Sequence, residues 1–83
     1  MRIDKFLKVS RIIKRRTLAK EITDQGRIMV NGKVAKASTT IKEGDYINIK
    51  FGQKELTVKV NRIVETSKKE DAINLYEVVE GEG

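Results

Sequence analysis

The apolar residues closest to the N-terminus recur at the spacing of one helix face. Ile3, Phe6 and Leu7 are separated by three positions and then one, which places them on the same side of a helix. Ser10 interrupts the run. We therefore predict a short helix over residues 3–9, with these three side chains turned toward the interior.

A second apolar stripe follows after a basic interval. Leu18, Ala19 and Ile22 form the inward face of a helix that we expect over residues 15–25. Gly26 comes directly after it, and glycine accepts the left-handed conformation that commonly ends a helix. No Ser, Asp or Asn stands at the expected start of this helix, so its first turn has no obvious side-chain cap.

The period of the pattern changes after the second helix. Two short β-prone segments, at residues 28–30 and 33–34, flank the dipeptide Asn31-Gly32. Both central residues of a type I′ turn need positive φ, and Asn-Gly satisfies that need better than most dipeptides. The sequence therefore predicts a β-hairpin here.

Alternating apolar and polar residues continue toward the C-terminus, as is typical of half-buried strands. We expect strands at residues 47–51, 56–60 and 73–79, and the second of these can extend through 62–64 past a bend. The acidic residues 80–83 are expected to form a flexible tail.

These elements define a small α+β fold in a single domain over residues 1–79. Two N-terminal helices pack on a small, mostly antiparallel sheet of four to five strands. No repeat, linker or second domain interrupts the pattern.

The composition removes most kinds of chemistry. The 83 residues include no cysteine and no histidine, so thiolate and imidazole metal ligands and the commonest general base are missing. We expect a protein that is not an enzyme and that uses neither a metal nor a cofactor. No apolar run approaches the roughly 20 residues that span a bilayer, so we expect no membrane partner and a cytoplasmic location.

The charge is divided unevenly between the two parts of the chain. Residues 1–36 have a net charge of +8, from eleven basic and three acidic residues, whereas residues 37–83 have −2, from seven basic and nine acidic residues. A solvated, lysine-rich surface would explain a high charge alone. However, five of the eleven bases are arginine, which forks onto phosphate and stacks on bases. The asymmetry therefore favours a binding face for a polyanion.

The start of the second helix is the strongest candidate site. Arg16 and Lys20 are four positions apart and share one helix face. Thr17 lies beside them where free N–H groups and the helix dipole favour phosphate. The alternative is that Arg16 pairs with an acid such as Asp4 or Glu21. We expect Arg16 to be exposed, so that its truncation changes stability by no more than about 0.5 kcal/mol.

Aromatic residues are too few to form a stacking platform for single strands, so the expected target is folded RNA, read through its backbone and shape. The candidate RNA-binding residues are Arg2, Lys5, Lys8, Arg11, Arg15, Arg16, Thr17, Lys20, Arg27, Asn31, Lys33 and Lys36.

Several segments, in order, resemble the alpha-L RNA-binding domain, which recurs in a small-subunit ribosomal protein, pseudouridine synthases and bacterial tyrosyl-tRNA synthetases. The similar segments are residues 2–7, 15–19, 26–34, 41 and 44–47. In that family two helices pack on a small sheet, and the helices and hairpin together grip RNA. The resemblance covers about residues 1–51, with one departure, because many members have a small capping residue where this chain has Arg15.

Residues 4–21 and the short length resemble more narrowly a family of small bacterial ribosome-associated quality-control factors, related to heat-shock RNA-binding proteins. This resemblance implies binding to the large ribosomal subunit through large-subunit ribosomal RNA and peptidyl-tRNA. It also implies support for a partner protein that adds a C-terminal tail to the stalled chain. We expect the free protein to be a monomer.

Two other functions stay open at this point. Two helices before a hairpin can mimic a helix-turn-helix DNA-binding protein, although the first helix is short for that scaffold. The acidic C-terminal half could instead make the protein an interaction adaptor. Comparing affinity for a ribosomal RNA hairpin and a DNA duplex at equal salt distinguishes RNA binding from DNA binding. Neutralising the arginine cluster tests the adaptor, which would keep its ribosome association.

Overall fold

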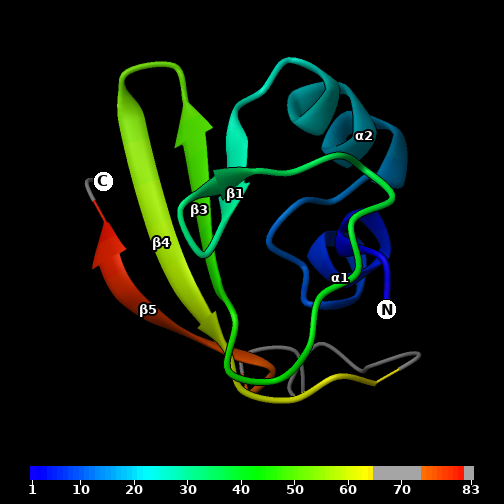
Figure 1. Cartoon of the computed structure of the whole chain (residues 1–83), viewed down its shortest axis with the longest axis vertical. Helices are drawn as coiled ribbons and strands as arrows, with labels where there is room; N and C mark the ends of the chain where they lie inside the picture. The colour runs from blue at the N-terminus through cyan, green and yellow to red at the C-terminus, as the bar shows by residue number, and fades with distance from the viewer. Residues whose placement is uncertain (65–73, 82–83) are drawn as a thin grey trace.

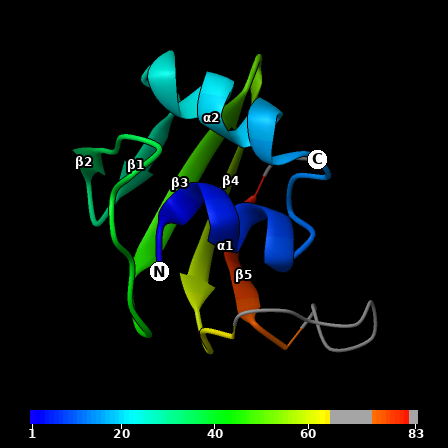
Figure 2. The same cartoon turned by 90° about the vertical axis from the view of Figure 1, so that its right-hand side faces the viewer.

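The computed structural model describes residues 1–64 and 74–81. Both helices lie against one face of a single antiparallel sheet, so this part of the chain forms two layers (Figure 1). Figure 2, turned by 90°, shows α1 and α2 in front of the central strands. The α+β fold predicted from the sequence is confirmed.

The first helix, α1, spans Ile3–Val9, as predicted. The side chains of Ile3, Phe6 and Leu7 are all fully buried. Arg2 is the N-cap, with extended backbone, and Ser10 is the C-cap. The apolar spacing was therefore sufficient to place both the helix and its inward face.

The second helix, α2, spans Arg16–Asp24, one residue shorter at each end than expected. Its buried residues are Ala19, Ile22 and Thr23. The prediction for Leu18 was wrong, because 45% of this residue is exposed. Successive residues turn by about 100° around a helix, so a buried face centred between Ala19 and Thr23 leaves Leu18 at its margin.

Five strands form the sheet in the order β2-β1-β3-β4-β5, and every pairing is antiparallel. The strands are β1 (Ile28–Val30), β2 (Lys33–Val34), β3 (Tyr46–Phe51), β4 (Lys54–Val60) and β5 (Tyr76–Gly81). The predicted hairpin is confirmed between β1 and β2. Asn31 and Gly32 both have positive φ, at 52° and 84°.

Two expectations for the C-terminal part need correction. β4 ends at Val60 and does not continue through residues 62–64, because the N–H groups of Asn61 and Arg62 turn toward the carbonyl of Leu75. β5 continues past the expected end.

Within β5, Glu80 pairs with Thr57 and Gly81 with Leu56. These two residues therefore belong to the sheet and not to a flexible tail. Residues 82–83, and the predicted strand start at Ile73, lie outside the described residues.

The core lies between the helices and the sheet. Apolar side chains from α1 and α2 meet Ile28, Ile47, Ile49 and Val58 of the three central strands. Residues 37–41, which follow β2, run beside the start of α1, where the N–H of Ile3 donates to the carbonyl of Thr39 at 2.8 Å. These backbone contacts, with the bridge between Arg2 and Thr40, hold Arg2 beside the segment that follows β2.

Candidate nucleic-acid interface

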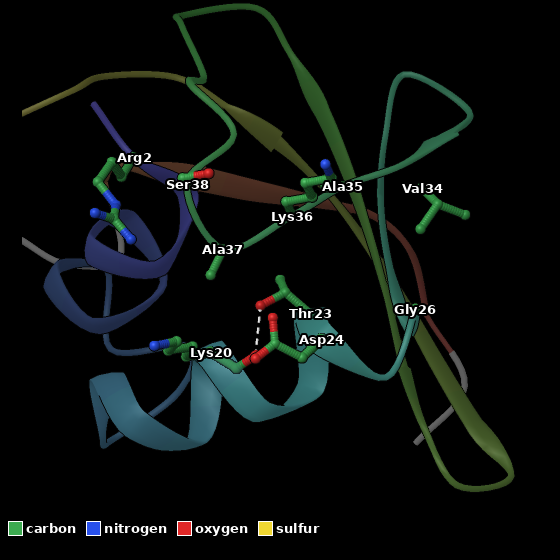
Figure 3. Close-up of a pocket in the computed structure, with 10 residues that line it drawn as sticks. All are labelled: Arg2, Lys20, Thr23, Asp24, Gly26, Val34, Ala35, Lys36, Ala37 and Ser38. Atoms are coloured by element: carbon green, nitrogen blue, oxygen red, sulfur yellow. Dashed lines mark hydrogen bonds between the residues drawn. The ribbon is translucent and has the colours of Figure 1, made fainter.

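A groove of about 470 Å³ lies between α2 and the segment after β2. Figure 3 shows α2 as one wall and residues 34–38 as the other, with Arg2 at one end. The groove is lined by Arg2, Lys20, Thr23, Asp24, Gly26, Val34, Ala35, Lys36, Ala37 and Ser38.

Three of the predicted RNA-binding bases meet in this groove. Arg2 is the N-cap of α1, Lys20 lies in the middle of α2, and Lys36 follows β2. All three are exposed, and Asp24 is the one acidic residue among those that line the groove. Cationic donors that converge on a concave surface suit the phosphates of a folded nucleic acid.

Beside the groove, the buried carboxylate of Asp4 joins the starts of both helices. Its Oδ2 accepts a hydrogen bond from Nη2 of Arg2 at 3.2 Å and lies 3.3 Å from Nε of Arg16. Its Oδ1 accepts the backbone N–H of Lys5 at 2.8 Å. Only 3% of the Asp4 side chain is exposed, against 51% for Arg2 and 46% for Arg16.

The ion pair settles the alternative left open for Arg16. Its acidic partner is Asp4, and Glu21 forms no ion pair with it. Since the guanidinium is half exposed, solvent weakens the attraction. The buried carboxylate of Asp4 keeps its bonds to Arg2 and to the N–H of Lys5 when Arg16 is truncated, so we expect the pair to contribute about 1 kcal/mol. The expected cost of truncating Arg16 therefore rises from about 0.5 to about 1 kcal/mol.

The start of α2 has the open geometry that the sequence suggested. Arg15 is the N-cap, with extended backbone (φ −123°, ψ 131°), and its side chain makes no capping hydrogen bond. Both Arg15 and Thr17 are exposed. N–H groups in an uncapped first turn can donate to an external anion. Anion binding at this helix start stays a prediction.

Asn31 has an intramolecular role that the site prediction did not anticipate. Its Nδ2 donates to Oδ1 of Asp45 at 3.2 Å, and its Oδ1 accepts the N–H of Tyr46 at 3.0 Å. The amide therefore ties the hairpin turn to the start of β3. The amide is exposed and keeps a second N–H group beyond these bonds, so direct contact with RNA stays a prediction for Asn31.

The other predicted bases lie outside the groove. Lys5, Lys8 and Arg11 belong to α1 and the turn after it, whereas Arg27 directly precedes β1 and Lys33 is the first residue of β2. All except the half-buried Lys5 are exposed. These bases are therefore distributed over both ends of the N-terminal half, and they do not share the groove with Arg2, Lys20 and Lys36.

Arg11 is distinctive among these outer bases, because its φ is +61°. Left-handed backbone is uncommon for a residue other than glycine, asparagine or aspartate. This conformation could not be predicted, since Ser10-Arg11 is not a recognisable turn motif.

The contact of Asp4 with both Arg2 and Arg16 was not predicted from the sequence. The sequence indicates Asp4 only as one possible ion-pair partner of Arg16. The signal available was an acid placed among the basic residues of the N-terminal half. Such a residue is unfavourable on a polyanion-binding face unless it has another task.

The part of the chain that the structure describes, residues 1–64 and 74–81, contains no group of three or more acidic side chains that could hold a metal ion. It also contains no helix long and apolar enough to cross a membrane.

Known proteins resemble both the sequence and the fold. The S4 domain matches residues 1–47. The RQC P-site tRNA stabilizing factor of Bacillus subtilis is 60% identical over 82 residues, covering 99% of this chain and 95% of that protein. The protein of the same name from Halalkalibacterium halodurans is 65% identical over 78 residues, covering 94% of this chain and 89% of the relative.

A solved structure supports the same relationship. The trimeric heat shock protein 15 of Vibrio cholerae superimposes with a TM-score of 0.87 at 30% identity, covering 95% of this chain and 81% of that one. The fold, the basic N-terminal face and the near full-length matches agree. This chain therefore belongs to the S4-domain family, alongside the RQC P-site tRNA stabilizing factors.

Proposed function

We propose that this protein is a non-catalytic RNA-binding factor of ribosome-associated quality control. It binds the large ribosomal subunit, contacts ribosomal RNA and the peptidyl-tRNA, and supports C-terminal tailing of the stalled chain by a partner protein. The relatives named as P-site tRNA stabilizing factors support the tRNA as a ligand. The groove supplies the basic side chains that would contact RNA phosphates.

The observation that carries the proposal is the meeting of Arg2, Lys20 and Lys36 around one concavity. These residues come from three separate elements, so the fold brings them together and local sequence does not. The packed elements fix the backbone positions of these three cations, and a fixed arrangement fits the phosphate spacing of a folded RNA better than that of a flexible strand.

Binding to purified large subunits tests the proposal. We expect the protein to bind subunits that hold peptidyl-tRNA more tightly than vacant subunits. The double variant Lys20→Ala/Lys36→Ala should lose affinity at least tenfold, which corresponds to about 1.4 kcal/mol. The matched control is Lys50→Ala/Lys54→Ala, which removes the same charge from exposed residues of β3 and β4 that do not line the groove.

Three outcomes would contradict the proposal. Equal losses for both double variants would mean that net charge alone drives association. Unchanged association of the groove variant would favour an interaction adaptor. A DNA duplex that binds better than a ribosomal RNA hairpin at equal salt would favour the helix-turn-helix alternative.

The tailing step needs its own measurement. With large subunits, peptidyl-tRNA and the tailing partner supplied, the parent protein should increase the number of residues added to the stalled chain. The groove variant should not. Equal tailing with and without the protein would limit its role to binding.

A further inference from the structure

We infer that Asp4 is a positioning residue, whose buried carboxylate holds the guanidinium groups of Arg2 and Arg16 in place for RNA phosphates. The inference rests on the proposed function and assigns a task to an acid at the centre of the basic face. It concerns how binding is achieved, because Asp4 itself is too buried to meet the ligand.

The geometry separates Asp4 from the other acids of the N-terminal half. Asp24 lines the groove and is exposed, and Glu21 is exposed on α2. Asp4, by contrast, uses one oxygen for two arginines and the other for the N–H of Lys5. Both carboxylate oxygens are therefore committed within the protein.

The two arginines belong to different helices. Arg2 precedes α1 and lines the groove, whereas Arg16 opens α2. Arginine side chains have much rotamer freedom, and holding them before the ligand arrives reduces the entropy lost on binding. A single buried carboxylate thus fixes two cationic groups relative to each other.

The contacts also leave part of each guanidinium available. Arg16 faces Asp4 through Nε, and among the described residues Asp4 is its only side-chain ion-pair or hydrogen-bond partner. About half of each arginine side chain is exposed. A planar guanidinium can be held along one edge while its remaining N–H groups donate to phosphate, whereas a lysine ammonium offers no such division.

The sign of the charge effect makes the inference testable. An acid on an RNA-binding face repels phosphate, so neutralising it should strengthen binding if charge is all that matters. A positioning role predicts the opposite for Asp4. Asp4→Asn keeps an acceptor for the N–H of Lys5 but loses the charge that holds the arginines.

The experiment compares Asp4→Asn with Glu21→Gln, which removes an equal charge from an exposed residue of α2 that does not line the groove. We measure affinity for large subunits that hold peptidyl-tRNA, together with a thermal melt of each variant. Asp4→Asn should bind about tenfold more weakly, a difference of about 1.4 kcal/mol. Glu21→Gln should bind as tightly as the parent or slightly more tightly.

A second variant covers the case in which Asp4→Asn does not fold. Arg16→Lys preserves Asp4 and the charge but removes the divided guanidinium, and it should also lose about tenfold in affinity. Its melting temperature should stay within a few degrees of the parent.

The inference is overturned if Asp4→Asn folds and binds as well as Glu21→Gln. It is also overturned if Arg16→Lys binds like the parent. If the parent itself does not bind, the proposed function fails instead.

Discussion

Two buried aspartates, Asp4 and Asp45, organise two regions of this molecule in different ways. Both are nearly inaccessible, with 2% and 7% of the residue exposed. Asp4 lies where the two helices begin, and its partners include two half-exposed arginines. Asp45 lies in the turn before β3 and binds only the amide of Asn31 and the N–H of Lys42 among side-chain hydrogen bonds of the described residues.

The difference shows how one residue type can serve binding or stability. The partners of Asp45 are neutral groups of the hairpin and the adjoining turn, so its bonds join parts of the scaffold. Asp4 bonds mainly to cationic groups that also face solvent. Changes in the Asp4 region should therefore alter mainly the affinity for RNA. Truncation in the Asp45 region should lower mainly the free energy of unfolding.

Ionic strength should separate the two regions most strongly. If about six bases meet phosphates, log affinity should fall against log salt with a slope of roughly −4 to −5. Raising salt from about 50 to about 200 mM would then weaken RNA binding by roughly 250- to 1,000-fold. The melting temperature should change little by comparison. Titrations at four salt concentrations measure the slope, and a flat response would remove electrostatics as the main contribution.

Truncating Asp45 should give the largest loss of stability. Asp45→Ala leaves the N–H of Lys42 and the amide of Asn31 without their acceptor. Both donors belong to exposed residues and can regain water, so each lost bond should cost its net value of about 0.5–1.5 kcal/mol. We therefore expect a loss of roughly 1–3 kcal/mol in the free energy of unfolding. Urea denaturation measures it. RNA affinity, measured below the melting temperature, should stay within about threefold of the parent. A larger loss would show that the Asp45 region also contributes to RNA binding.

Truncating Arg16 should show the reverse pattern. Arg16→Ala removes a charge-assisted contact, which should cost roughly 1.5–3 kcal/mol of binding, or about tenfold to more than a hundredfold. Stability should fall by about 1 kcal/mol or less, because the pair with Asp4 is half exposed. Sedimentation with large subunits and a thermal melt measure the two effects. A variant that co-sediments like the parent would show that the start of α2 is the wrong site.

Replacing Arg11 should have the smallest effect of these changes. Its effects on stability and on RNA binding should have opposite directions. Glycine adopts positive φ without strain, so Arg11→Gly should leave stability unchanged or raise it by up to about 1 kcal/mol. Loss of a basic side chain should meanwhile weaken RNA binding a few-fold.

The matched control for Arg11 is Asn31→Gly, at a nearly equal φ of 52°. That variant should lose stability, because the amide of Asn31 bonds to Asp45 and Tyr46. Destabilisation by Arg11→Gly comparable to that of Asn31→Gly would assign Arg11 to the scaffold.

Much of the fold followed from the sequence, because its signals are local. Helical spacing placed α1, and the Asn31-Gly32 dipeptide placed the first hairpin. The rotation of α2 and the end of β5 were harder to predict. Whether Leu18 is buried depends on how α2 is rotated against the sheet, and the end of β5 depends on pairing with β4.

The site was only partly predictable for a similar reason. Charge distribution identified the basic half, but the groove needs Arg2, Lys20 and Lys36 to meet from three elements. The bond from Asp4 to Arg2 is local, whereas its pair with Arg16 depends on how the two helices pack. Spacing along one helix cannot reveal a partner on another.

The backbone contacts at the N-terminus show that charge and architecture divide this chain at different places. Residues 1–36 contain eleven of its basic residues. Yet the N–H of Ile3 bonds to Thr39, and the N–H of Ile41 bonds to the carbonyl of Met1. A peptide ending at residue 36 would retain the charge of the binding half without the chain that anchors α1. The basic segment is consequently not a transplantable module, and grafting it onto another protein would transfer affinity for polyanions without the shape that selects among them.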